Sequence, residues 1–174
     1  MQKLGMVGKD VTAAEIITSV ESRKATVWAT NPTQSNSGAT VLFSFLNHFA
    51  GNPPGQALTQ TQLTSPQVVK GMQAFVGSIS RTPPSTGTMM DDCIAQPDVC
   101  QTMFTYEDLV IDKNRELVKQ GKQPLYIAYP RGAMAISDSP LGFSRHGQDQ
   151  ADAKHQIFTE LQTYILSDPD ARTK

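Results

Sequence analysis

The stretch TNPTQSNSGATVLFSFLNHFAG, residues 30–51, decides the fold prediction, because a strand turns into a helix within it. The preceding residues 25–30, ATVWAT, are β-branched and apolar, which predicts a buried strand. Apolar side chains then recur at helical spacing through residues 38–50, and Gly51 is a typical helix stop. Several polar residues are crowded between the two elements: Thr33, Ser35, Asn36, Ser37 and Thr40.

The polar junction has the composition of an anion-binding helix start. A helix N-terminus has unpaired backbone N–H groups and about half a positive charge, and after a strand it faces the carboxyl edge of the sheet. Ser35, Ser37 and Thr40 would add hydroxyl donors, and Gly38 would let a ligand approach the backbone. The same residue types are common caps, so one of Ser35 or Ser37 is expected to be only a cap. The stretch matches neither a phosphate-binding glycine loop nor a hydrolase nucleophile elbow.

Helical and strand patterns alternate along the rest of the chain. Thr12 and Glu15 form a predicted capping box, and Ser65 followed by Pro66 predicts another helix start. Helices are expected at residues 11–22, 66–79, 107–120 and 151–166, and strands at residues 102–106, 124–130 and 133–137. This alternation favours an α/β sandwich with a mostly parallel sheet.

The segments between these elements are predicted to be irregular. Residues 51–64 are rich in Pro and Gly, which is typical of a loop. Residues 80–93 are expected to be irregular as well, with a short helix opening at Ser85. A further helix is expected to begin at Ser167.

Composition and charge exclude several classes of protein. The chain has 174 residues, for which one domain is the expectation. Its 15 basic and 16 acidic residues give a net charge of −1 without a block of like charge, so a nucleic-acid footprint is not expected. No apolar run approaches the length of a membrane span, and the first ten residues lack the apolar region of a signal peptide.

Two cysteines, Cys93 and Cys100, are spaced as C-x6-C, which matches neither a zinc ribbon nor a redox C-x-x-C motif. No metal is expected here, because no histidine lies near them in the sequence. Asp, Gln and Pro between them indicate an exposed loop. Two free thiols in the cytosol and one short disulfide in an oxidising compartment both fit this pattern.

Four stretches carry a resemblance to a known family. They are TNPTQSNSGA at 30–39, MFTYEDLVID at 103–112, PLYIAYPRGAMAISDSPLGF at 124–143 and FTELQTYILSDPDARTK at 158–174. In their order and spacing they resemble the second lobe of bacterial extracellular solute-binding proteins of the type II class, which is the class of molybdate-, sulfate- and phosphate-like binders. The resemblance covers most of the chain.

The resemblance implies a fold and a context. It implies that residues 1–174 are a single lobe, a three-layer α/β/α sandwich, excised from a two-lobed protein about twice as long. The missing first lobe and a membrane permease are the implied partners, and no cofactor is implied. The implied location is periplasmic or extracellular, with membrane anchoring left open, and some relatives are fused to von Willebrand factor type A domains. In that setting Cys93 and Cys100 are expected to form a disulfide.

The resemblance also implies ligand-binding positions and no catalytic ones. They fall at a helix N-terminus, on a second loop facing the cleft, and at the end of a strand: Ser35, Asn36, Ser37, Gly38, Ser85, Thr86, Gly87, Tyr106 and Glu107. The Glu107 carboxylate would repel a plain oxyanion unless it were protonated or shielded by a cation. A ligand that carries an amine or hydroxyl groups, or a metal, is therefore also considered.

Other residue types that often carry chemistry have simpler interpretations. His48, His146 and His155 are expected at the surface, Asp91–Asp92 in a solvated turn, Arg131 in a turn or a surface ion pair, and Trp28, Met89 and Met90 in the core.

Two further functions stay open at this point. One is a protein-interaction module that presents the loop at residues 51–64 or a sheet edge. The other is a hydrolase with Ser35 or Ser37 as nucleophile, which needs a histidine base within hydrogen-bond reach.

Overall fold

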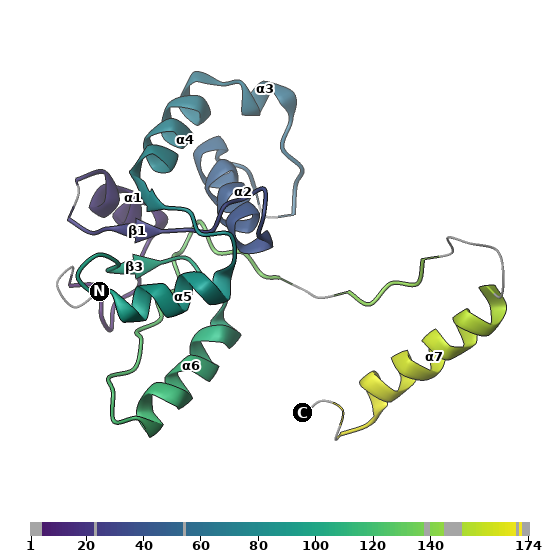
Figure 1. Ribbon diagram of the computed structural model, residues 1–174. Helices are drawn as coiled ribbons and strands as arrows, with labels where there is room; N and C mark the ends of the chain where they lie inside the picture. The colour runs from purple at the N-terminus through teal and green to yellow at the C-terminus, as the bar shows by residue number, and fades with distance from the viewer. Residues whose placement is uncertain are drawn as a thin grey trace. The chain divides into compact units, whose positions relative to one another are not determined.

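Three short parallel strands form a sheet in the order β2-β1-β3, from β1 (Val27–Trp28), β2 (Ile79–Arg81) and β3 (Thr102–Met103). The fold is mixed α/β, with this small sheet flanked by helices (Figure 1). The computed structural model describes residues 5–22, 24–53, 55–137, 140–144, 151–169 and 171.

The chain divides into two compact units, Met1–Ala135 and Ile136–Lys174. The described residues of the first unit contain α1 (Ala13–Glu21), α2 (Asn36–Ala50), α3 (Gln60–Leu63), α4 (Pro66–Ser78), α5 (Thr86–Ala95) and α6 (Glu107–Lys119). The second unit contains α7 (Ala151–Ser167). The helix expected to begin at Ser167 lies largely outside the described residues.

The start and stop signals of the helices are confirmed. Thr12 and Glu15 form both bonds of a capping box at the start of α1. Ser65 caps α4 and Pro66 is its first residue. Gly51 ends α2 in the left-handed conformation with φ 61°, which costs glycine nothing because it lacks a Cβ.

Some elements differ from the prediction. The strand expected at residues 25–30 is confirmed only at its centre, β1, and β2 replaces the expected last residue of α4. The irregular region at residues 80–93 contains most of α5, and the loop at residues 51–64 contains α3 with its own capping box. The short helix expected to open at Ser85 is confirmed as α5, whereas α3 was not predicted, because four residues are too few to show an apolar period.

The strand predicted at residues 124–130 is wrong. The side chain of Asn114 in α6 bonds to both backbone polar groups of Leu125. Its amide N–H donates to the Leu125 carbonyl oxygen (2.9 Å), and its amide oxygen accepts from the Leu125 N–H (2.6 Å). This side chain takes the place of a strand neighbour, and only an isolated bridge between Arg131 and Thr12 follows. The strand predicted at residues 133–137 is also absent, and its Met134 and Ile136 side chains are exposed.

The buried apolar side chains form two clusters that involve different helices. In the first, Phe45 of α2 stacks on Phe75 of α4 with ring centroids 3.8 Å apart, and Ala13 of α1 completes it. In the second, Trp28 of β1 packs with Met89 of α5 and the two cysteines. Figure 1 shows α2 and α4 on one side of the strands and α5 and α6 on the other. The expected core positions of Trp28, Met89 and Met90 are confirmed.

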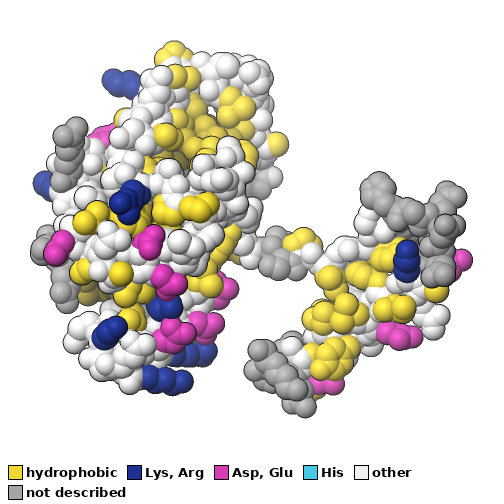
Figure 2. All heavy atoms as spheres, in the orientation of Figure 1, with side chains coloured by type: hydrophobic (Ala, Val, Ile, Leu, Met, Phe, Trp, Pro, Cys, Tyr) yellow, Lys and Arg dark blue, Asp and Glu magenta, His cyan; other side chains and the backbone are white. Residues whose placement is uncertain are grey.

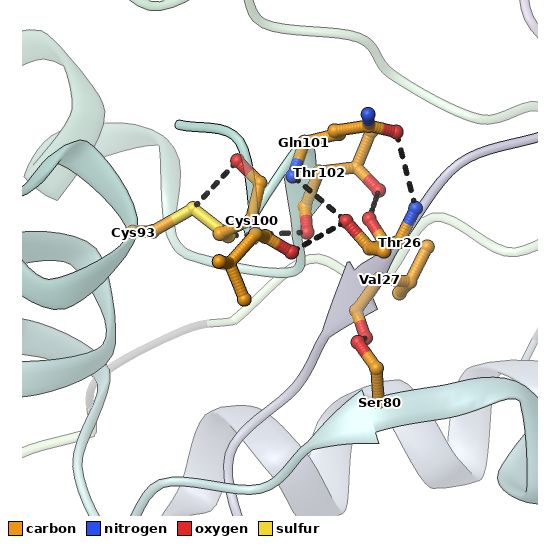
Figure 3. The surroundings of a disulfide bond; sticks show 8 residues. Thr26, Val27, Ser80, Cys93, Cys100, Gln101 and Thr102 are labelled. Carbon is orange, nitrogen blue, oxygen red and sulfur yellow. Dashed lines mark hydrogen bonds between the residues drawn. A yellow bond between two sulfur atoms is a disulfide. The ribbon is translucent and has the colours of Figure 1, made fainter. Parts of the chain in front are cut away.

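Cys93 and Cys100 form a disulfide with Cα atoms 5.0 Å apart (Figure 3). The exposed loop expected between the two cysteines is confirmed for residues 96–99, whereas the cysteines themselves are buried and Cys93 lies in α5. Thr26 holds the chain on both sides of Cys100, since its hydroxyl donates to the Val99 carbonyl oxygen (2.7 Å) and accepts from the Gln101 N–H (3.1 Å). The disulfide thus joins the end of α5 to the segment that leads into β3.

The second unit contains an aromatic cluster of its own. The Phe143 ring lies 5.4 Å from that of Phe158 and 5.1 Å from that of His155, between ring centroids. These contacts place the segment before α7 against its first half.

Among the described residues, no helix combines the length and the apolar character that a membrane crossing requires. The disulfide is consistent with an oxidising compartment.

Replacing both cysteines, Cys93→Ala with Cys100→Ala, is expected to lower the free energy of unfolding by about 2.5 kcal/mol, because a short closed loop no longer constrains the unfolded chain. Urea denaturation followed by Trp28 fluorescence measures this, since Trp28 is the only tryptophan and lies in the same cluster. Reductant should destabilise the wild type and leave the double variant unchanged. Equal stability of the two proteins would show that the disulfide has no role in the fold.

Candidate functional site

The carboxyl edge of the sheet is the point where three helices begin. Because the strands are parallel, β1, β2 and β3 end at the same edge. Each is followed by a helix start, which is α2 after β1, α5 after β2 and α6 after β3. Each of these helix starts carries a partial positive charge. Three partial positive charges therefore lie at this edge, and the acidic side chains of Glu107 and Asp108 lie in the first turn of α6.

Four hydroxyl groups meet at this edge, from Thr30, Ser35, Ser37 and Thr86, and we call them the hydroxyl cluster. The Ser37 Oγ atom lies 2.7 Å from Thr30 Oγ1 and 2.6 Å from Thr86 Oγ1. Ser35 Oγ lies 3.2 Å from Ser37 Oγ and 3.3 Å from Thr86 Oγ1. The cluster joins the start of α2 to the start of α5, as the sequence prediction of two facing loops requires.

Most of the hydroxyl cluster is inaccessible to solvent. Thr30, Ser37 and Thr86 are 2%, 4% and 8% exposed, while Ser35 is half-buried. Buried hydroxyl groups need hydrogen-bond partners, and these supply one another. Ser35 is therefore the most accessible member of the cluster.

The start of α2 has no side-chain cap. Ser35 is the N-cap residue by its extended backbone, but its hydroxyl bonds within the cluster and makes no capping bond. Ser35 is thus at the N-cap position, as expected of one of the two serines, but its side chain does not cap the helix. By contrast, Thr12, Ser65 and Ser85 each accept a bond from a backbone N–H in the first turn of α1, α4 and α5.

Gly38 serves the packing of α2 on β1. A Cβ atom at Gly38 would lie 2.2 Å from the Thr30 carbonyl oxygen and 2.9 Å from Thr30 Oγ1. The backbone at Gly38 therefore packs against Thr30, just after β1. Thr30 fills the space beside Gly38 in which a ligand was expected. The role predicted for Gly38 in admitting a ligand is thus replaced by a structural role.

Asn36, Tyr106, Glu107 and Tyr129 form a more accessible group at the same edge. The Asn36 side-chain amide donates to the Tyr106 hydroxyl (3.1 Å), which brings the starts of α2 and α6 together. The Tyr129 hydroxyl donates to the Glu107 carboxylate. This bond, burial and the carboxylate charge raise the pKa of Tyr129. Asn36, Glu107 and Tyr129 are exposed.

Ser85 starts the short helix that the sequence predicts at this position. Its hydroxyl accepts from the Thr88 N–H (3.2 Å) and donates to Thr88 Oγ1 (2.8 Å), so it caps α5. The neighbouring Thr86 is the residue of this loop that joins the hydroxyl cluster. Gly87 has open space around it.

Two members of this edge were not predicted from the sequence. Thr30 ends the predicted strand, and its place at a strand terminus is the signal that would have indicated it. Tyr129 lies in a stretch expected to be a strand, and its pairing with Glu107 has no local signal. Thr33 and Thr40 stay outside the cluster: the Thr33 hydroxyl donates to Asn31 Oδ1 (2.8 Å), and Thr40 accepts at its carbonyl oxygen from Ser44 (2.9 Å).

A serine nucleophile with a histidine base is not assembled by the residues described. His48 lies 11 residues beyond Ser37 in α2, about 16 Å along the helix axis. Its ring packs against Phe45 and Phe49 and is half-buried, so the surface position expected of His48 is confirmed only in part. His146 lies outside the described residues, and His155 contacts Phe143 in the second unit.

Asp91 and Arg131, two charged residues singled out in the sequence, each lie in an ion pair. Asp91 pairs with Lys113 of α6 at 3.0 Å and lies within α5, so the expected turn at Asp91–Asp92 is wrong. Arg131 lies 3.9 Å from Asp10, which confirms a surface ion pair. Among the described residues, no three His, Cys, Asp or Glu side chains come together as a metal site would require.

Two hollows of the surface lie away from this edge. One, of about 360 Å³, is lined by α1 and the residues before it. The other, of about 620 Å³, is lined by the ends of α1 and α4, the residues just before β1, and the start of β2. The residues that line these two hollows include none of the predicted site residues.

Comparisons of this chain with models of protein families, with curated proteins and with solved structures give no significant match. Its function therefore has to be argued from its own residues.

Gly38→Ala is expected to lower the free energy of unfolding by about 3 kcal/mol, because the added Cβ meets the backbone of Thr30. Thermal or urea denaturation measures the loss. Gly77→Ala is the matched control, because Gly77 lies within α4 and nothing lies within 4 Å of an added Cβ. This variant should unfold with a free energy about 0.5 to 1 kcal/mol higher than that of the wild type. A neutral Gly38→Ala would contradict the close contact between α2 and β1.

Glu107→Gln is expected to lower the pKa of Tyr129 towards its ordinary value. The substitution removes the carboxylate that accepts the hydrogen bond of the Tyr129 hydroxyl and that repels the phenolate. In the wild type, Tyr129 stays protonated to higher pH, so its contribution to stability is retained until the pH rises through the raised pKa. Absorbance titration of tyrosinate measures this, with Asp108→Asn as the control next to Glu107. Identical titration curves for wild type and Glu107→Gln would show that the two side chains do not pair in solution.

Proposed function

We propose that this chain is a non-catalytic solute-binding lobe of an ABC-type transport or sensing system, with its ligand at the start of α2. The observation that carries the proposal is the uncapped N-terminus of α2 at a sheet edge where α5 and α6 also begin. Backbone N–H groups at such a terminus bind acceptor oxygens without any Lys or Arg. The finer fold assignment, one α/β/α lobe of a type II binding protein, forms part of this proposal.

An orphaned hydroxyl at the same edge supports a polar ligand. Thr105 Oγ1, between β3 and α6, is buried without a hydrogen-bond partner in the structure. Buried polar groups in folded proteins are nearly always satisfied, so a hydroxyl of this kind fits a place that a ligand or water completes. Asn36 and Tyr106, which bond to each other, would frame the ligand on its exposed side.

The charges at this edge define the class of ligand. The N–H groups at the start of α2 suit ligand oxygens that accept hydrogen bonds. The exposed Glu107 carboxylate instead favours a ligand group that donates a hydrogen bond. The best match is a small molecule that carries oxygen acceptors at one end and amine or hydroxyl donors at the other. A simple oxyanion would bind more weakly, because Glu107 and Asp108 lie in the first turn of α6.

The cellular context is proposed on the same basis. A second lobe that covers this edge would supply the other half of the contacts, and a membrane permease would receive the ligand. The buried disulfide supports a periplasmic or extracellular location, because short disulfides of this kind persist in oxidising compartments.

Asn36→Asp is expected to abolish ligand binding at the start of α2. A carboxylate there would neutralise the partial positive charge of the helix N-terminus and repel the oxygens of the ligand. Sulfate and phosphate, separately titrated to about 50 mM, are the probes, and the readout is the rise in unfolding temperature that a native-state ligand produces. The wild type should be stabilised by one of them, and Glu107→Gln should be stabilised further.

Gln67→Glu is the matched control, because it adds the same charge to the first turn of α4, away from this edge. It should respond to both probes as the wild type does. Equal responses of the wild type, Asn36→Asp and Glu107→Gln would mean that the anions act non-specifically, and the α2 start would then lose its role as a binding site.

A further inference from the structure

The larger of the two hollows lies at the amino edge of the sheet, opposite the edge where α2, α5 and α6 begin. It has a volume of about 620 Å³ and is lined by the ends of α1 and α4, by the residues just before β1 and by the start of β2. Sites for small molecules have volumes of about 300 to 1,000 Å³. The hollow is therefore large enough for a small ligand, and it shares no lining residue with the hydroxyl cluster.

Two helices end at this hollow, and each end carries a partial negative charge. α1 ends at Glu21 and α4 ends at Ser78, and both residues line the hollow. The C-terminus of a helix carries about half a negative charge, which a basic residue in the last turn often offsets. The last turns of α1 and α4 contain no basic residue. Lys24, which follows α1, is exposed and does not line the hollow.

The carboxylate of Glu21 adds a full negative charge beside these helix ends. Charged side chains gather over α6 on the face shown in Figure 2, and there Asp112 pairs with Arg115 at 2.9 Å. Glu21 is exposed, and within the described part of the chain it has no such ion pair. The described residues that line the hollow include no Lys, Arg or His. The hollow therefore has a negative character that no cation of its own lining offsets.

The hydroxyl groups in the lining donate their protons to the protein itself. The Ser80 hydroxyl donates to the Val27 carbonyl oxygen (3.0 Å), and the Ser78 hydroxyl donates to the Phe75 carbonyl oxygen. The Thr26 hydroxyl also donates to a backbone carbonyl oxygen (2.7 Å). A hydroxyl group has one proton and two lone pairs. What Ser78 and Ser80 retain for a ligand is therefore lone pairs, which accept hydrogen bonds.

We propose that this hollow binds a small protonated primary amine with a short aliphatic chain. An ammonium group donates hydrogen bonds and accepts none, so it matches a lining that offers a carboxylate, serine lone pairs and the negative ends of two helices. The aliphatic chain would lie on the apolar part of the lining, which contains Val20, Ala25 and Ile79. This site does not depend on the ligand proposed for the start of α2.

A metal ion fits this lining less well than an ammonium group does. Ca²⁺ and Mg²⁺ take about six or more oxygen ligands, among them carboxylates. Glu21 is the only acidic residue among the described residues that line the hollow. Hydrogen bonds to a carboxylate and hydroxyl groups, together with the partial charges of the helix ends, are enough for an organic cation.

Chemical-shift titration of the ¹⁵N-labelled full chain with butylammonium chloride, at constant ionic strength, is the test. Saturable shifts are expected at the backbone amides of the lining residues, with a Kd of about 1 to 10 mM for so small a ligand. Two compounds separate the charge from the rest of the molecule: 1-butanol has the same chain without the charge, and tetramethylammonium has the charge without N–H donors. Both should bind at least about fivefold more weakly.

Two variants locate the site. Glu21→Gln should weaken butylammonium binding about two- to fivefold, because an exposed carboxylate is lost. Gly77→Leu should prevent binding, since Gly77 lines the hollow and an added Cβ has nothing within 4 Å, so the larger side chain can enter the hollow. Asp112→Asn removes a carboxylate from α6 and should bind as the wild type does. Trp28 fluorescence checks that each variant is folded.

Three results would overturn the proposal. The first is the absence of saturable shifts with butylammonium. The second is equal affinity for butylammonium and 1-butanol, which would show that the charge is not recognised. The third is equal affinity for butylammonium in the wild type, Glu21→Gln and Gly77→Leu, because the amine would then bind elsewhere on the chain.

Discussion

The contact between the backbone of Gly38 and the end of β1 is the constraint on which the rest of this edge depends. Any side chain at Gly38 would enter the space of the Thr30 carbonyl oxygen, so only glycine lets α2 begin this close to the sheet. That approach brings Ser37 within 2.7 Å of Thr30 and within 2.6 Å of Thr86, and the starts of α2 and α5 become one polar unit. A single missing Cβ therefore positions the hydroxyl cluster.

Local signals in the sequence predicted the helices well. The capping box of Thr12 and Glu15, the Ser65–Pro66 start and the Gly51 stop depend only on residues within one turn of each other, so a sequence contains all that is needed to find them. The pKa of Glu15 is lowered chiefly by its bond to the Thr12 backbone, which is the electrostatic counterpart of the same local arrangement.

Strands and site partners were harder to predict because they depend on distant residues. Residues 124–130 have the composition of a strand. The side chain of Asn114, however, bonds to the N–H and carbonyl groups of Leu125 that would otherwise pair with a neighbouring strand. The sequence indicated Ser35, Ser37 and Thr86 as polar residues near helix starts, while their mutual bonds span about 50 residues of chain. The pairing of Tyr129 with Glu107 likewise requires the fold.

The hydroxyl cluster also limits how a ligand can be held. Four hydroxyl groups supply four protons, and the four contacts among Thr30, Ser35, Ser37 and Thr86 can use all of them. A ligand that accepts a hydrogen bond from the Ser35 hydroxyl must break one of these bonds, at a cost of about 1 kcal/mol. The backbone N–H groups of the uncapped first turn carry no such cost. Recognition at this edge would therefore depend on the α2 backbone, with the hydroxyl cluster holding that backbone in place.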